Sequence, residues 1–246
     1  MNTARYAIGL STSTGTASLA IVKHLHAPCA GSVQFAGQHY AGVYRCDIAD
    51  YKAQSAELLP RLKQALDDLQ VDVNNLAALG VDVGPGGFTS LRTACGIAQG
   101  LCTAWNLPAV PVSSFEAMLV DYTVQQGGPL AAVTCAMDAR LNELYCAQLQ
   151  FVNNQTHFTQ APYLLAVSQW DTLTQTPVLC DSGAYALATN PAHCMQFNAS
   201  GFAVALLAWR ELAANRTKTA FECQPLYVRN KVAQTTFERL GNKHGV

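Results

Sequence analysis

The sequence predicts an α/β protein made of two related halves. Short apolar runs typical of strands alternate with longer stretches of helical periodicity in both halves of the 246 residues. A strand, a polar turn and a second strand open the chain, and the same layout returns after residue 130, which suggests a duplicated fold. Hydrophobic residues make up 50% of the chain, which excludes a disordered protein.

The first half contains a regular series of expected elements. Residues 6–10 and 17–22 predict two strands joined by the polar turn 11–16, and 42–47 predicts a third strand. Leu58, Leu62 and Leu66 recur at helical spacing and predict a helix over 55–70. A strand at 77–83 leads through a glycine-rich turn into a helix that ends near residue 105. A strand at 109–112 and a helix at 113–125 follow, with Ser113 or Ser114 as the N-cap.

A break at 126–129 divides the chain into expected domains of residues 1–126 and 127–246. Strands are predicted at 131–137 and 143–149 on either side of a turn made by Asp138, Ala139 and Arg140. A strand at 177–180 leads into Asp181, and a helix is expected at 203–214. The chain is irregular from residue 224 onward.

Charge and cysteine content exclude several classes of protein. Only 13% of residues are charged, where about 25% is usual, so we expect part of the surface to be covered by another molecule. The net charge of −1 and the lack of a basic run argue against a chain that binds nucleic acid alone; the densest basic stretch is 229–243. The nine cysteines are scattered without a C-x-x-C motif and predict reduced thiols in a cytoplasmic protein. The uncharged run 93–115 is interrupted by polar residues and prolines, so no membrane span is expected.

The glycine-rich turn that begins at Gly84 is the sharpest local motif. Gly86 and Gly87 allow positive φ, so a strand can turn sharply into a helix start, where exposed N–H groups attract phosphate. It lacks the lysine of a Walker A loop, so anion binding and a purely structural turn both remain open. The hydroxyl-rich turn 11–16 has the same two interpretations, phosphate binding and a structural turn. It holds no carboxylate for Mg²⁺, which argues against phosphoryl transfer. The candidate phosphate- or nucleotide-binding residues are Ser11, Thr12, Gly84, Gly86, Gly87, Asp138 and Arg140.

The other polar motifs favour structural roles. Asp138 is expected to pair with Arg140, and Asp181 to cap the turn after its strand. No histidine spacing of a metal site and no G-x-S-x-G elbow is present, so no metal ligand and no catalytic residue is predicted. The glycines and other small residues of the 89–105 helix fit packing on the chain's own sheet, and small residues on several faces also allow the close approach of a second helix.

Four stretches, in order along the chain, together resemble the TsaB family. They are the hairpin 8–21, the glycine-rich turn 84–92 with 96–101, the stretch 137–145 and the stretch 225–233. The resemblance implies an ASKHA-type (actin-like, RNase H-like) fold and a non-catalytic subunit that helps to make threonylcarbamoyladenosine beside the tRNA anticodon. It also implies a heterodimer with the catalytic subunit TsaD, an ATPase partner TsaE, and no cofactor of its own beyond ATP or ADP at the heterodimer boundary.

The same resemblance places the TsaD contact on the first-domain helices. The expected interface residues are Leu58, Leu62, Leu66, Arg92, Ala94, Ala98 and Cys102. Contact with tRNA is expected only through the assembly, and a homodimer is an alternative when TsaD is absent. Ser11 stands where the family usually has an aspartate that helps ATP-using ASKHA proteins to place phosphate and Mg²⁺. A stand-alone ATP-dependent kinase and a peptidase are the alternative functions.

Overall fold

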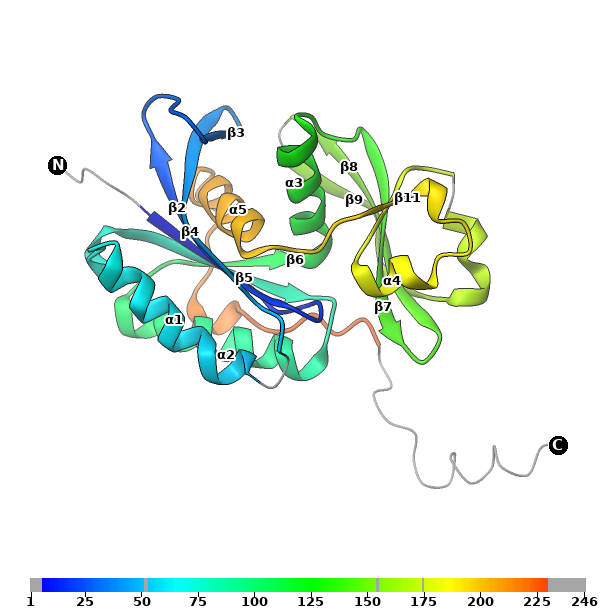
Figure 1. The fold of residues 1–246 in the computed structure, drawn as a ribbon, viewed down its shortest axis with the longest axis horizontal. Coiled ribbons are helices and arrows are strands. Elements are labelled where there is room, and N and C mark those ends of the chain that lie inside the picture. The colour runs from blue at the N-terminus through cyan, green and yellow to red at the C-terminus, as the bar shows by residue number, and fades with distance from the viewer. Residues whose placement is uncertain (1–5, 51–52, 154, 174, 230–246) are drawn as a thin grey trace, which may run out of the picture.

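Two mixed β-sheets with helices packed on their faces form the molecule (Figure 1). The computed structural model describes residues 6–50, 53–153, 155–173 and 175–229. The first sheet has the order β3-β4-β2-β1-β5-β6, and the second has the order β11-β10-β7-β8-β9. The strands of the first sheet are β1 (Tyr6–Ser11), β2 (Ala17–Leu25), β3 (Val33–Phe35), β4 (Gln38–Ile48), β5 (Leu76–Gly84) and β6 (Ala109–Ser113). Those of the second are β7 (Ala132–Arg140), β8 (Glu143–Val152), β9 (Gln155–Ala166), β10 (Val178–Cys180) and β11 (Cys194–Gln196).

The two sheets share one topology apart from β3, which extends the edge at β4. In the first sheet β1 and β2 pair antiparallel, as do β2 and β4, whereas β5 and β6 continue the sheet in parallel from β1. In the second sheet β7, β8 and β9 pair antiparallel, and β10 and β11 continue it in parallel from β7. The predicted α/β class and duplicated layout are therefore confirmed, and the fold is of the ASKHA type.

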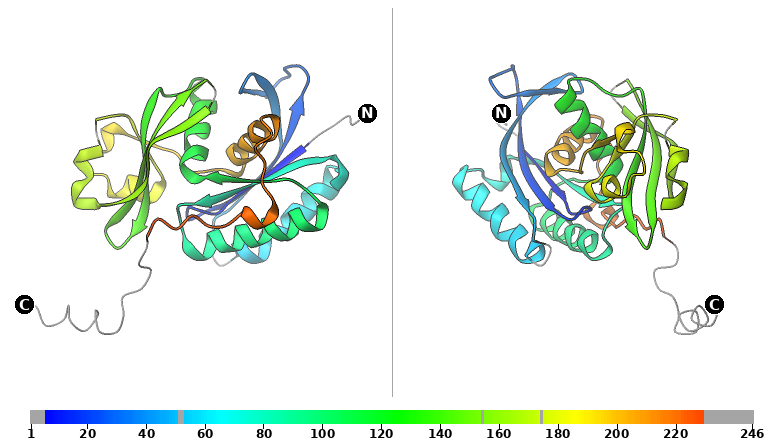
Figure 2. Two further views of the ribbon diagram at one scale, coloured as in Figure 1. Left: turned by 180° about the vertical axis from the view of Figure 1, so that it is seen from behind. Right: turned by 45° about the vertical axis from the view of Figure 1, so that its right-hand side comes forward.

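The helices are α1 (Gln54–Asp68), α2 (Phe88–Trp105), α3 (Ser114–Gln126), α4 (Ser182–Leu187) and α5 (Gly201–Ala213). Helices α1 and α2 lie side by side on one face of the first sheet, as both views of Figure 2 show. Their inward side chains, with those of β1, β2 and β5, form one buried apolar cluster. Helices α3 and α5 cover the opposite face and pack on each other. Among the described residues, no helix is long and apolar enough to cross a membrane.

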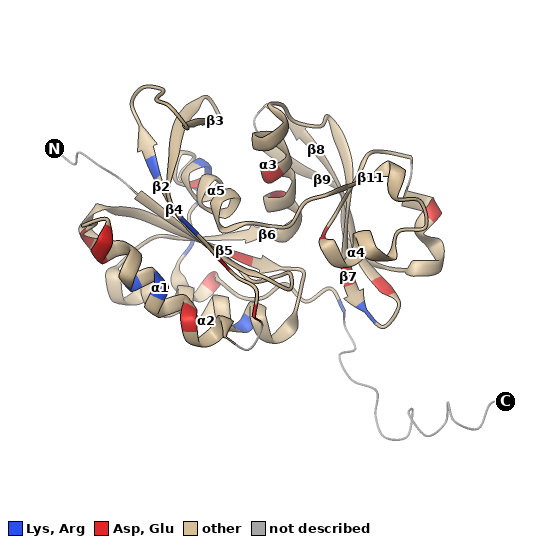
Figure 3. Cartoon of the chain, viewed as in Figure 1, with Lys and Arg blue, Asp and Glu red and all other residues tan. Residues whose placement is uncertain are grey.

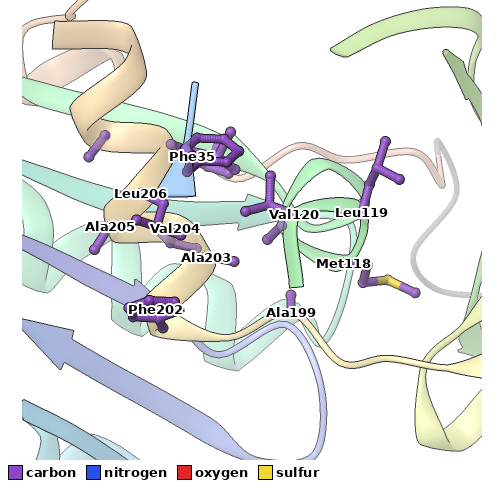
Figure 4. Packing of buried hydrophobic residues seen from close by; sticks show 14 of the residues in the cluster. Phe35, Met118, Leu119, Val120, Ala199, Phe202, Ala203, Val204, Ala205 and Leu206 are labelled. Atoms are coloured by element: carbon purple, nitrogen blue, oxygen red, sulfur yellow. The ribbon is translucent and has the colours of Figure 1, made fainter. Parts of the chain in front are cut away.

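Helix α5 returns from the second half of the sequence to the first sheet. It contacts β1, β2 and β5, and Figure 4 shows Phe202 and Val204 of α5 in the same apolar cluster as Val120 of α3. This close approach requires glycine at position 9, because a Cβ atom there would lie 2.0 Å from the carbonyl oxygen of Gly201. The strands of the first sheet all precede residue 127, and those of the second sheet all follow it. The division into domains 1–126 and 127–246 stays a prediction, and α5 comes from the second of these parts but packs on the sheet of the first.

Several predicted elements need correction. Strands β3, β9 and β11 were not predicted. Strands β3 and β11 have only three residues each, too few for a period to show, and the edge strand β9 has no buried residue and lacks the alternation of a half-buried strand. The expected turn at Asp138–Arg140 is wrong, because β7 continues to Arg140 and the chain reverses at Leu141 and Asn142, with φ of 57° and 58°. Ser113 has the backbone conformation of an N-cap, but its side chain makes no capping hydrogen bond.

Candidate functional site

A cleft of about 370 Å³ lies where the turns of the two halves face each other. Its walls come from the β1–β2 turn, the glycine-rich turn, the start of α2, the β7–β8 connection, the start of α4 and a C-terminal stretch. Of the candidate phosphate-binding residues, Gly86, Gly87, Asp138 and Arg140 line the cleft. Ser11, Thr12 and Gly84 do not line it.

The hydroxyl groups of Ser11 and Thr12 are used inside the protein. Ser11 is fully buried, and its Oγ donates a hydrogen bond of 2.7 Å to Asp82 Oδ2. Thr12 is also buried, and its Oγ1 donates to the backbone oxygen of Ser90 over 2.9 Å. These bonds tie the first hairpin to β5 and α2, so the structural interpretation of the hydroxyls fits this geometry better than phosphate binding.

Asp82 is the buried polar centre that sequence reasoning missed. Its Oδ1 accepts hydrogen bonds from Ser114 Oγ at 2.6 Å and from the Gly84 N–H at 2.9 Å. Burial raises the pKa of Asp82, whereas the hydrogen bonds from Ser114, Ser11 and Gly84 act in the opposite direction. The signal was a lone carboxylate within the apolar strand β5, since a buried acid requires several donors around it.

The glycine-rich turn closes against the first hairpin. Gly84 has φ of 109° and precedes Pro85 through a cis peptide bond, whereas Gly87 has φ of −62°, so the turn uses the positive φ open to glycine at Gly84 and not at Gly87. Gly86 is required by close packing instead, because a Cβ there would lie 2.3 Å from the carbonyl oxygen of Ser13. The Gly87 N–H donates to that same oxygen over 3.1 Å. One donor of the turn is thus already paired within the chain.

The acidic residues opposite the glycine-rich turn have the predicted structural partners. Arg140 Nη1 lies 2.9 Å from Asp138 Oδ2, which confirms the expected ion pair. Asp181 caps α4 by accepting from the Ala184 N–H at 2.7 Å, and it also accepts from the Asp138 N–H at 3.1 Å. Burial raises the pKa of the Asp181 carboxyl, and the backbone donors counteract that rise. No group of His, Cys, Asp or Glu able to hold a metal ion occurs in the part of the chain that the structure describes.

A C-terminal segment, residues 223–229, runs from α2 to the second sheet (Figure 2, left). Its residues 226–229 line the cleft. Gln99 Nε2 donates to the carbonyl oxygen of Cys223 at 2.8 Å, and the Leu226 N–H donates to the carbonyl oxygen of Val83 at 2.7 Å. At the other end, Arg229 Nη2 donates to the carbonyl oxygen of Ala139 at 3.1 Å and contacts the Glu143 carboxylate. The segment therefore ties the two halves together; the rest of the basic stretch 229–243 lies outside the described residues.

Arg92, a predicted interface residue, is held at the cleft edge. Its Nε donates to the hydroxyl of Tyr227 at 2.8 Å, and its guanidinium carbon lies 3.9 Å from the centre of the Phe88 ring. The rings of Phe88 and Tyr227 are 5.3 Å apart. No local sequence signal marks Tyr227, because its partners lie more than a hundred residues earlier in the chain.

The other predicted interface residues lie in the core of the chain itself. Leu58, Leu62, Leu66, Ala94, Ala98 and Cys102 are each 7% exposed or less and belong to the cluster under α1 and α2. Their spacing identifies the inner face of each helix, so an interface on these helices needs further side chains, although Leu62 and Leu66 also line the groove described next. The outer face holds an apolar groove of about 570 Å³ lined by Leu59, Pro60, Leu62, Lys63, Leu66, Asp67, Val71, Val73, Leu101 and Trp105.

The outer face of α2 has two further properties. Arg92 is its one charged residue, and Figure 3 shows the remainder of the helix in tan. Gly96 and Gly100 point outward, and a Cβ atom at either would meet nothing within 4 Å. Each glycine costs a helix about 1 kcal/mol relative to alanine, and no packing contact within the described residues accounts for this cost.

Residues 49–246 match the family model described as TsaD, tRNA N6-adenosine threonylcarbamoyltransferase. The chain is 29% identical to the tRNA threonylcarbamoyladenosine biosynthesis protein TsaB of Haemophilus influenzae, over 74% of this chain and 82% of that protein. It is 32% identical to TsaB of Escherichia coli over 40% of this chain and 42% of that protein. The structure of YeaZ from Pseudomonas aeruginosa superposes with a TM-score of 0.69 at 24% identity, covering 92% of this chain and 99% of that one, which supports the fold. Given these matches, the chain belongs to the TsaB/YeaZ family.

Proposed function

We propose that this protein is a non-catalytic subunit of the complex that makes threonylcarbamoyladenosine in tRNA, and that it binds and supports the TsaD subunit. A role in that biosynthesis follows from its family, whose relatives carry that name. The observation that supports the scaffold role is the outer face of α1 and α2, where an apolar groove lies beside a helix whose one charged residue is Arg92.

The exposed glycines indicate what kind of partner fits this face. Without a Cβ at Gly96 and Gly100, a partner helix can approach the α2 backbone closely. Dispersion contacts and burial of the groove would then offset the cost of two helix glycines. The groove side chain Leu59 is 43% exposed in the isolated chain and would be covered in the same step.

The non-catalytic part of the proposal rests on polar groups of the two turns that already donate hydrogen bonds within the chain. Ser11 donates to Asp82, and the Gly87 N–H donates to Ser13, so both lie in hydrogen bonds within the chain. ATP hydrolysis needs groups that hold phosphate and neutralise its developing charge. A nucleotide in the assembly would require groups from TsaD, in line with binding at the subunit boundary rather than on this chain alone. TsaE, in this proposal, binds the heterodimer.

The test is copurification with TsaD, using one disruptive variant and one control. Gly100→Trp puts a bulky ring on the exposed face of α2 and is expected to abolish coelution, while leaving the free chain folded. Ala213→Trp makes a change of comparable size at an exposed position of α5 and is expected to coelute normally. Coelution of the Gly100→Trp chain with TsaD would exclude this face as the interface.

Ala98 is unsuitable for this test, because it is fully buried and a bulky side chain there would disturb the core. The purified chain is also assayed for ATP turnover without TsaD. Robust turnover by the chain alone would contradict the scaffold role and favour the kinase alternative.

A further inference from the structure

Exposed apolar side chains gather at the mouth of the cleft. The exposed large hydrophobic residues of the described chain are Leu59, Phe88, Leu141, Val152, Phe158, Phe221, Leu226 and Tyr227. Phe88, Leu141, Leu226 and Tyr227 all line the cleft, although they come from α2, the β7–β8 connection and the C-terminal segment. We call these four residues, with Arg92 and Arg140, the mouth patch. Clustering of this kind on a surface is typical of an interaction site.

The rings of the mouth patch are held in place although they are exposed. Phe88 is 39% exposed and Tyr227 is 46% exposed. Arg92 fixes both, with its guanidinium 3.9 Å from the centre of the Phe88 ring and its Nε 2.8 Å from the Tyr227 hydroxyl. A pre-ordered pair of rings loses little conformational entropy when a flat ligand stacks on it.

The charges that point outward from the mouth patch are positive. Arg140 is 83% exposed, whereas its partner Asp138 is 14% exposed and therefore recessed. Arg92 is exposed, and its contacts in the described part of the chain are with aromatic groups rather than a carboxylate. Arg229, which also lines the cleft, is paired with the Glu143 carboxylate. The patch thus offers aromatic faces beside two outward guanidinium groups.

We infer that the mouth patch docks the unpaired nucleotides of an RNA loop, with a base against the Tyr227 and Phe88 rings and phosphates against Arg92 and Arg140. Aromatic rings beside arginines are the usual means of holding single-stranded RNA, since bases stack on the rings and the cations meet the backbone. The inference rests on the proposed function, because it takes the loop to be that of the tRNA whose adenosine the complex modifies. It adds a direct RNA contact on this chain.

The experiment uses a tRNA anticodon stem-loop hairpin with 2-aminopurine in the loop, added to the complex with TsaD and separately to this chain alone. Stacking of the probe base on the patch should change its fluorescence. Tyr227→Leu removes the ring but keeps an apolar side chain, and is expected to weaken hairpin binding about tenfold and to remove the fluorescence change. Arg92→Gln is expected to lower the slope of log affinity against log salt by about 0.7.

Phe88→Leu is compared with a matched control. Phe158 lies on β9 with the same 39% exposure as Phe88 but outside the cleft, so Phe158→Leu should bind the hairpin as the unaltered chain does.

Unchanged affinity and fluorescence in Tyr227→Leu and Phe88→Leu would overturn the inference, whether or not TsaD copurifies. Loss of TsaD binding by these variants with unchanged binding of the hairpin to the chain alone would also overturn it, and would identify the patch as a protein contact. Failure of the unaltered chain to bind TsaD would count against the proposed function only, because the hairpin is also tested on the chain alone.

Discussion

A buried carboxyl group at Asp121 should make the stability of this protein depend on pH. Asp121 lies on α3 and is 7% exposed. Its Oδ2 accepts from the Ser200 N–H at 2.9 Å, and its Oδ1 accepts from Ser200 Oγ at 2.7 Å. Ser200 Oγ in turn accepts from the Ala203 N–H at 3.1 Å and caps α5. The carboxyl group therefore joins the two helices that cover one face of the first sheet.

Burial raises the pKa of Asp121 from 3.8 to about 7, with Asp47 of β4 adding to the rise. The hydrogen bonds from Ser200 and the charge of Arg45 of β4 oppose it. Because the folded state binds the proton more tightly than the unfolded state, stability is highest below the unfolded pKa and falls as the pH rises toward 7. The whole shift corresponds to about 4 kcal/mol, of which about 2.5 kcal/mol falls between pH 5 and pH 8.

The assay is urea unfolding of the purified chain at several pH values from 5 to 8. Asp121→Asn removes the titrating group while its amide can still accept from the Ser200 N–H. The difference in unfolding free energy, Asn variant minus unaltered chain, should increase by about 2.5 kcal/mol from pH 5 to pH 8. This difference cancels the contributions of other titrating groups such as Asp82 and Asp181. Parallel profiles for the two proteins would refute the reasoning.

Three further changes test the packing of the glycines and the cap of α4. Gly86→Ala would place a Cβ 2.3 Å from the Ser13 carbonyl oxygen and should cost about 1–3 kcal/mol in thermal unfolding. Gly96→Ala, with open space at its Cβ, should instead gain about 1 kcal/mol, and equal effects of the two changes would contradict this account. Asp181→Ala removes the cap of α4 and the partner of the Asp138 N–H, at a cost of about 1–2 kcal/mol. Faster hydrogen exchange confined to the Asp138 and Ala184 amides would support that role, and unchanged exchange would contradict it.

Local patterns predicted most of the elements and four of the residues that line the cleft. The helical spacing of Leu58 and Leu62 predicted α1, but both side chains are buried in the core of the chain rather than free for the expected contact with TsaD. The ion pair of Asp138 with Arg140 and the cap at Asp181 were also predicted, because both depend on residues close together in the sequence. Strand β9 was missed because it lies at the sheet edge with none of its residues buried, so the apolar alternation of a half-buried strand is absent.

The sequence by itself determined the alternation of strands and helices, the duplicated layout and the family, because these depend on short-range periodicity and on motifs within single stretches. The tertiary structure decided which side of α2 faces outward: Ala98 is buried against the sheet, whereas Gly96 and Gly100 meet open space. It alone brought Tyr227 to Arg92, through a segment that returns to the first half of the molecule. The physical reason is that burial and long-range contact arise from how whole elements pack, which no window of neighbouring residues encodes.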